Sequence, residues 1–301
     1  MKQILMNNAL ESWGLSIRYC DEILAGKATL GNRKNFVSSL QNSIELFIKQ
    51  YMLNIGDYRV SAPKDIDSDG EPMASYLSAK DLNGFFYDLQ KNDELLMRKF
   101  YSAEFNKLVD WQKKLFDDYY QKNPLSKNVV CDGLKVLKQL RNNETHFYID
   151  EFDFLSENEF VMLHNTMVEF FKILVHYHLL NIWGKSSHGE ETRITFLREP
   201  LSSFSYKEQL KTSKYVAKLK QEIENKMFPT GCGDDAYLIA QDIVTWGENL
   251  NELNFDELWA YIQMLLKYKM LIIHEEVDED VIDGVPAFSP YREYEVRLNS
   301  S

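Results

Sequence analysis

Apolar residues recur at helical spacing through most of the first 184 residues of this 301-residue chain. The clearest case is residues 31–53, in which six apolar residues follow steps of three and four: Val37, Leu40, Ile44, Phe47, Ile48 and Tyr51. Such steps place side chains on one face of an α-helix, and that face must be buried against other elements. The spacing therefore predicts a long amphipathic helix that belongs to a helical bundle.

Helical periodicity predicts further helices before residue 184, at residues 78–91, 93–121, 125–142 and 157–183. Residues 56–72 are polar and rich in turn formers, so they are expected to form a loop. The helix at 125–142 should turn Leu134, Leu137 and Leu140 inward. The run at 157–183 is so apolar that it is expected at the centre of the bundle, with Gly184 ending it. The predicted fold class is mainly α, with residues 1–184 forming one bundle.

The pattern changes after residue 184. Residues 185–233 are expected to form a linker with a short strand at 193–199 and a basic helix at 206–227. Residues 234–301 should form a small α+β domain, with helices at 235–246 and 255–269 and two alternating runs, 269–277 and 291–299, joined by an acidic connection. Asn254 and Glu257 have the spacing of a capping box. Two helices followed by a β-hairpin predict a winged-helix-like C-terminal domain.

Negative charge is concentrated in that C-terminal segment. The whole chain carries −12, whereas residues 234–301 hold fifteen acidic and four basic residues, a net −11. An acidic surface gains nothing from the release of counterions on a phosphate backbone. Duplex DNA is therefore not an expected partner, and the segment is interpreted as a protein-contact module. A basic run elsewhere is either a solvated helix face or a phosphate-tracking surface: Lys122, Lys127, Lys135, Lys138 and Arg141.

Length and composition bound the class of protein. A chain of 301 residues exceeds the size at which one core usually stops growing, so two domains are expected. The three cysteines form no CxxC pair and suit a reducing compartment. The first residues lack the apolar stretch of a signal peptide, and no run reaches the roughly 20 apolar residues of a membrane span. We expect a soluble cytoplasmic protein with no membrane partner.

One segment contains residue types suited to catalysis: RNNETHFY at residues 141–148. RNA can be cut without a metal ion when its 2′-OH is deprotonated and attacks the adjacent phosphate. His146 could take or give that proton near neutral pH, and the guanidinium of Arg141 could stabilise the charge that develops on the phosphate. On an unbroken helix these two side chains would lie about 140° apart. Either the helix ends or bends at Asn142 and Asn143, or the two side chains serve a site shared with a second subunit.

The motif Arg-Asn-x3-His resembles that of ribonucleases in the HEPN (higher eukaryotes and prokaryotes nucleotide-binding) family, over about residues 1–184. The resemblance implies an HEPN-like helical bundle in which Arg141, Asn142 and His146 are catalytic. Glu45, which precedes Lys49 by one turn, matches a less specific family pattern and is implied as a supporting residue. Tyr148 fits the His-x-Tyr extension of HEPN toxins, whose minimal nucleotidyltransferase antitoxin adenylylates that tyrosine.

The resemblance implies a metal-independent endoribonuclease with no cofactor, acting as a homodimer on RNA in toxin–antitoxin or abortive-infection defence. The alternative is a non-catalytic HEPN-like helical module that binds a nucleotide or a protein partner. Other candidates are weaker. His176 and His178 are two residues apart, so on a helix they cannot share a metal. Cys232 lies between two glycines and is expected in a plain loop. The acidic residues from 275 to 283 lack the spacing of an EF-hand.

Overall fold

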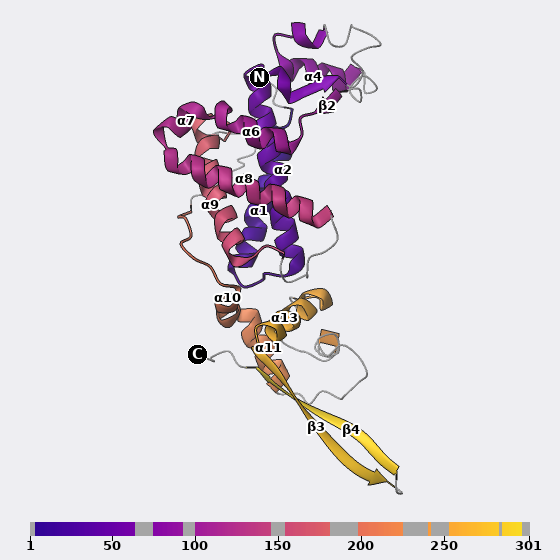
Figure 1. Cartoon of the computed structure of the whole chain (residues 1–301). Helices are drawn as coiled ribbons and strands as arrows, with labels where there is room; N and C mark the ends of the chain where they lie inside the picture. The colour runs from indigo at the N-terminus through magenta and orange to yellow at the C-terminus, as the bar shows by residue number, and fades with distance from the viewer. Residues whose placement is uncertain are drawn as a thin grey trace. The chain divides into compact units, whose positions relative to one another are not determined.

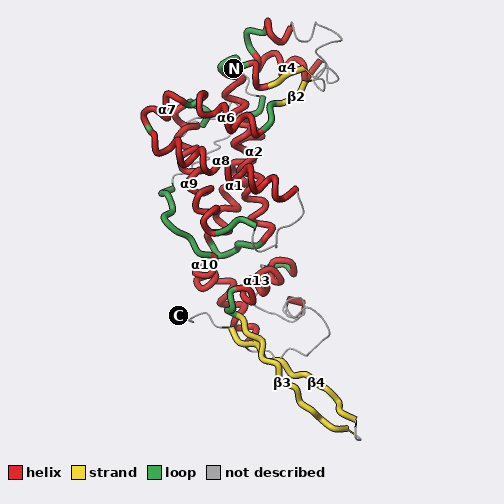
Figure 2. The backbone as a smooth tube through the Cα atoms, in the orientation of Figure 1, coloured by secondary structure: helices red, strands yellow, loops and turns green. Residues whose placement is uncertain are grey.

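The computed structural model describes residues 4–63, 75–92, 100–145, 154–180, 198–224, 240–241, 253–282 and 285–296, with only the backbone described at 62–63, 142–145, 224, 273–282 and 285–296. Helix is the dominant secondary structure of these residues, which confirms the mainly α prediction (Figures 1 and 2). The chain divides into two compact units. Unit 1 comprises Met1–Cys20 and Lys34–Phe204, and unit 2 comprises Asp21–Arg33 and Ser205–Ser301.

These units differ from the expected domains in two ways. The boundary lies at residue 204 instead of 184, and residues 21–33 group with the C-terminal unit. Inside unit 2, Lys27 forms an ion pair with Glu257 at 2.7 Å. Gly26 has a φ of +84°, and an added Cβ would lie 2.9 Å from the carbonyl oxygen of Gln209, so this position requires glycine. The segment between the first two helices is thus part of the C-terminal core.

The helices of unit 1 largely follow the apolar periodicity. The elements are α1 (Met6–Leu24), α2 (Leu30–Asn54), α4 (Leu82–Asn92), α6 (Phe105–Leu115), α7 (Asp117–Lys122), α8 (Pro124–Thr145) and α9 (Glu157–His176). On α2, the predicted stripe is buried from Val37 to Ile48, and Tyr51 is half-buried. On α8, Leu134, Leu137 and Leu140 are buried as expected. Trp13 joins the helices, with its ring centroid 6.1 Å from that of Phe47 and 6.4 Å from that of Phe170.

Helices α8 and α9 approach each other closely at Gly133. A Cβ built on this residue would lie 1.8 Å from Oγ1 of Thr166, which is fully buried on α9. That hydroxyl is held in place because it donates to the carbonyl oxygen of Met162 at 2.7 Å and contacts that of Val129 at 3.2 Å. Glycine therefore sets the distance between the two helices, two turns before Arg141.

A small lobe follows α2 and contains the first departures from the sequence predictions. Residues 56–72 were expected to be a loop, but the described part forms a 3₁₀ turn, Tyr58–Val60, and strand β1, Ser61–Pro63. Strand β1 pairs antiparallel with β2, Phe100–Ser102. The single helix predicted at 93–121 is therefore wrong, because its described part contains β2, α6 and α7. Five aromatic rings contact one another in the lobe: those of Tyr58, Tyr76, Phe85, Phe86 and Phe100.

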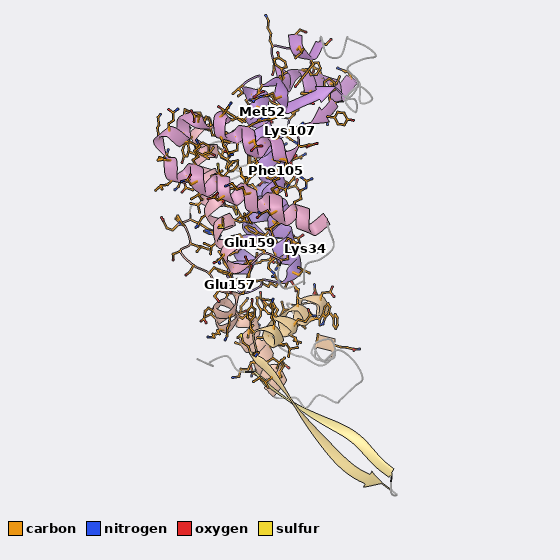
Figure 3. All side chains as sticks on the ribbon, in the orientation of Figure 1. Lys34, Met52, Phe105, Lys107, Glu157 and Glu159 are labelled. Carbon is orange, nitrogen blue, oxygen red and sulfur yellow. The ribbon has the colours of Figure 1, made fainter. Side chains whose placement is uncertain are left out.

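Helix α9 begins as a capped helix and ends before the predicted residue. Ser156 and Glu159 form a capping box, and Glu157 and Glu159 are labelled at this end in Figure 3. The helix ends at His176 instead of Trp183 because His178 adopts a left-handed φ of +55°. The amide of Leu179 then donates to the carbonyl of Leu174, and the amide of His178 to that of Val175. This is a Schellman ending with histidine where glycine is usual. Gly184 lies outside the described residues.

Unit 2 contains α10 (Tyr206–Thr212), α11 (Lys214–Glu224), α13 (Phe255–Lys267) and the strands β3 (Leu271–Ile282) and β4 (Val285–Val296). The basic helix expected at 206–227 is thus two helices that meet at Ser213, and both belong to the unit instead of a linker. The strand expected at 193–199 is not described before residue 198, and residues 198–200 form no strand. The predicted capping box of Asn254 and Glu257 is confirmed.

The C-terminal hairpin is longer than expected. Strands β3 and β4 align in register from Leu271 with Val296 to Ile282 with Val285, and in Figure 1 they extend from α11 and α13 as a two-stranded ribbon. The acidic segment predicted to connect the strands is itself part of β3. The helix expected at 235–246 lies outside the described residues except at Ala240 and Gln241, both helical. The winged-helix arrangement therefore stays a prediction. Among the described helices, none has both the length and the apolarity needed to cross a bilayer.

Candidate functional site

Helix α8 carries the beginning of the motif. It continues without interruption through Thr145, and Arg141 is exposed one turn before its end. In Figure 1 the C-terminal end of α8 extends past its neighbours. Asn142 belongs to α8 by its backbone, whereas His146 and Tyr148 lie outside the described residues. The sequence left two ways to bring Arg141 and His146 together. The structure excludes an end of the helix at Asn142, because α8 continues to Thr145.

A cleft of about 350 Å³ lies beside Arg141, between three elements. Helix α2 contributes Glu45 and Lys49, and α8 contributes Lys138 and Arg141. The third wall is made by residues 102–106, where β2 leads into α6. Phe105, labelled in Figure 3, marks the start of α6 and is buried. The structure thus places Arg141 in one cleft with Glu45 and Lys49, which lie far earlier in the chain on α2.

Glu45 and Lys49 form an ion pair across one turn of α2. Nζ of Lys49 lies 2.5 Å from Oε1 of Glu45, with side-chain exposures of 7% and 22%. A lysine so deeply buried requires a partner, because an unpaired ammonium loses its hydration without compensation. Glu45 supplies that partner from one turn earlier on α2. The pair therefore holds an ammonium in the wall of the cleft, with a net charge of zero for the two side chains together.

Positive charge exceeds negative charge among the described residues of the cleft. Lys49 and Lys138 join Arg141, whereas the acidic groups are Glu45 and Glu104. Glu104 is the N-cap residue of α6, but its side chain makes no capping hydrogen bond. The first turn of a helix also carries unsatisfied amides and a partial positive charge. Lysine, arginine and helix amides together favour a phosphate or another anion in this cleft.

A second hollow of about 220 Å³ adjoins the cleft. Glu45 and Arg141 line both spaces and so form the divider between them. The rest of the second hollow is lined by one face of α2: Val37, Ser38, Gln41 and Asn42. We call the first space the cationic cleft and the second the polar hollow.

Sequence reasoning had found part of this site. It singled out Arg141 and Glu45, and it noted Lys138 within a basic run without assigning it a site. The spacing of Lys138 and Arg141, three residues apart on one helix, was a usable signal. Neither the polar hollow nor the wall at residues 102–106 was predicted from the sequence. Gln41 carries no sequence signal of its own, and the wall depends on β2, which was predicted to be helix.

The remaining candidates do not form a second centre. His176 is exposed, with Nε2 3.4 Å from a carboxylate oxygen of Asp118. The hydroxyl of Tyr177 donates to the same carboxylate, and this hydrogen bond lowers the pKa of Asp118. Within the described part of the chain, no three His, Cys, Asp or Glu residues lie close enough together to hold a metal ion. Cys232 lies outside the described residues, and no side chain is described for the acidic residues from 275 to 283.

Comparisons with protein-family models, with curated proteins and with solved structures found no match to this chain.

Proposed function

We propose that this chain is a metal-independent endoribonuclease of the HEPN type. The observation that carries the proposal is the cationic cleft, in which Arg141 lies with Lys138 and the buried pair of Lys49 and Glu45. These residues come from α2 and α8, and nothing in local sequence requires them to meet. A cleft of this charge suits the phosphate of an RNA strand.

In the proposed reaction, the 2′-oxygen of RNA attacks the adjacent phosphorus atom and the bond from phosphorus to the 5′-oxygen breaks. A base removes the proton of the 2′-OH, and an acid protonates the leaving 5′-oxygen, so the products are a 2′,3′-cyclic phosphate and a 5′-hydroxyl. The guanidinium of Arg141 donates hydrogen bonds to the phosphate oxygens as negative charge develops there. His146 exchanges the protons, Asn142 orients the motif, and Glu45 holds Lys49 in the wall of the cleft.

We propose that two copies of the chain form the active enzyme. Helix α8 does not end at Asn142 but continues through Thr145, and side chains five residues apart on a regular helix lie about 140° apart. The reaction also needs a base and an acid in the same turnover, whereas each chain offers one histidine in the motif. A second motif facing the first would supply both requirements. The projecting end of α8 in Figure 1 is the surface through which such a pair would form.

The proposed setting is a toxin–antitoxin or abortive-infection system, and it rests on the family resemblance alone. In that setting Tyr148, which lies two residues after His146, is the proposed site of adenylylation by an antitoxin. The net −11 of residues 234–301 favours a protein as the partner of unit 2 over a nucleic acid.

Purified protein incubated with total RNA in the presence of EDTA tests the activity. We expect cleavage by the wild type, with a loss of about a hundredfold or more in Arg141→Ala and in His146→Ala. Lys135→Ala is the matched control, because Lys135 is an exposed cation of α8 that pairs with Asp132 and does not line the cleft. Cleavage that survives in Arg141→Ala would contradict the proposal. Binding of RNA by the wild type without cleavage in EDTA would favour the non-catalytic module.

A further inference from the structure

The two spaces beside Arg141 differ in charge although they share a divider. The cationic cleft holds Lys49 and Lys138 in addition to Arg141, against the two acidic residues Glu45 and Glu104. In the polar hollow, Arg141 and Glu45 carry the only charges among the described lining residues, and the other lining residues are neutral. A phosphate is stabilised in the first space, whereas an uncharged hydrogen-bonding group is better suited to the second.

Gln41 is the most informative residue of the polar hollow. It is only 7% exposed, and the described part of the chain supplies no hydrogen-bond partner for its carboxamide. The carboxamide is not among the buried polar groups that lack a partner, so its atoms reach the hollow and are accessible to a ligand. Its amide can donate two hydrogen bonds and accept two. Because Gln41 lines the hollow, the place that a partner would occupy is the hollow itself.

Two other buried glutamines of unit 1 show the contrast. Gln50 donates to Asn54 and Asn83 and accepts from the backbone amide of Leu5. The amide of Gln112 is likewise bonded within the chain, since its oxygen accepts the hydroxyl of Tyr120. Gln41 lies on the same helix as Gln50 and is buried almost as well, but its partner is not supplied by the described protein.

We infer that the polar hollow binds the base of the nucleotide next to the phosphate held at Arg141, and that the carboxamide of Gln41 selects that base. The inference rests on the proposed function for the identity of the phosphate as part of RNA. A carboxamide can pair with the donor and acceptor on one edge of a base. That edge is accessible when the base is unpaired, so the substrate class is single-stranded RNA.

Equilibrium binding of uncleavable RNA tests the inference without relying on catalysis. The probes are fluorescent 2′-O-methyl ten-mers of sequence (AU)5, (CU)5, (GU)5 and U10, which lack the attacking hydroxyl, measured by fluorescence anisotropy at low salt. We expect the wild type to favour one sequence by about five- to tenfold, the effect of one net hydrogen bond. In Gln41→Met, which keeps the length of the side chain without its polar atoms, the preference should fall to within about twofold.

Gln139→Met is the matched control, because Gln139 is an exposed glutamine of α8 that lines neither space. It should keep the preference of the wild type. Gln41→Asn, which retracts the carboxamide by one methylene, provides a second variant with the same expected loss if the methionine variant folds poorly by circular dichroism. Equal binding of all four probes by the wild type, or a preference that persists in both Gln41 variants, would overturn the inference.

The outcome is separable from that of the proposed function. A chain that cuts RNA in EDTA but shows no preference dependent on Gln41 keeps the ribonuclease proposal and loses this inference. A chain that binds one probe selectively through Gln41 but cuts no RNA keeps this inference and loses the ribonuclease proposal.

Discussion

Replacing Gly133 with alanine should destabilise the bundle, although the same change usually stabilises a helix. In a helix interior, alanine is favoured over glycine by about 1 kcal/mol. At Gly133, however, the new Cβ would lie 1.8 Å from Oγ1 and 2.7 Å from Cβ of Thr166, well inside the roughly 3.5–4.0 Å of a normal contact. Thr166 is fully buried and hydrogen-bonded, so α8 must move away from α9. Overpacking of this kind costs about 1–3 kcal/mol.

We therefore expect Gly133→Ala to lower the free energy of unfolding by up to about 2 kcal/mol after its gain in helix propensity is included. Gly14→Ala is the control, because Gly14 lies within α1 and an added Cβ there meets no atom within 4 Å. That variant should be about 0.5–1 kcal/mol more stable than the wild type. Urea unfolding followed by circular dichroism measures both.

The double variant with Thr166→Ala isolates the contact. Removing the threonine side chain makes room for the new methyl group, so the two changes together should cost less than the sum of the single changes by about 1 kcal/mol. If Gly133→Ala is as stable as Gly14→Ala, the close approach of α8 and α9 does not limit this position and the reasoning fails.

Two further changes test individual side chains. Glu45→Gln leaves the ammonium of Lys49 without its carboxylate, so it should lower the free energy of unfolding in urea by about 1–3 kcal/mol. Asp132→Asn, in an exposed pair, should change it by no more than about 0.5 kcal/mol. Equal losses in the two variants would contradict the role of burial. Tyr177→Phe should raise the pKa of Asp118 toward its ordinary value, because it removes the hydroxyl that lowers it. A lowered carboxyl pKa stabilises the folded state above the ordinary pKa of aspartate and loses that contribution as pH falls through the folded value. A carboxyl titration by NMR that is unchanged in the variant would refute this assignment.

Elements defined by local spacing could be predicted from the sequence. The stripe from Val37 to Ile48 identified α2, and Asn254 with Glu257 identified the start of α13. In both cases the decisive interactions join residues three or four positions apart. The hairpin was also expected, although its length was underestimated. The pair Asp283-Gly284 between the strands was a further signal, since Asp-Gly favours a two-residue connection.

Elements that depend on distant partners could not be predicted in this way. Strand β2 is three residues long, too short to show an alternating pattern, and it forms because Ser102 and its neighbours pair with β1, forty residues earlier. The end of α9 depends on His178 adopting a conformation that favours glycine, stabilised by burial of Leu179. No residue type in these segments indicates the strand β2 or the end of α9 at His176.

In the candidate site, too, some features follow from local sequence and others from tertiary packing. By itself, the sequence determined that Arg141 lies on a helix and that Glu45 and Lys49 face each other one turn apart, because a regular backbone dictates both. Only the tertiary structure decided that α2 and α8 bring these residues to one cleft and that Gln41 lines a hollow beside it. Packing across the whole bundle, as at Gly133, sets which helix faces meet. Such contacts join residues that are distant in the chain and share no local sequence pattern.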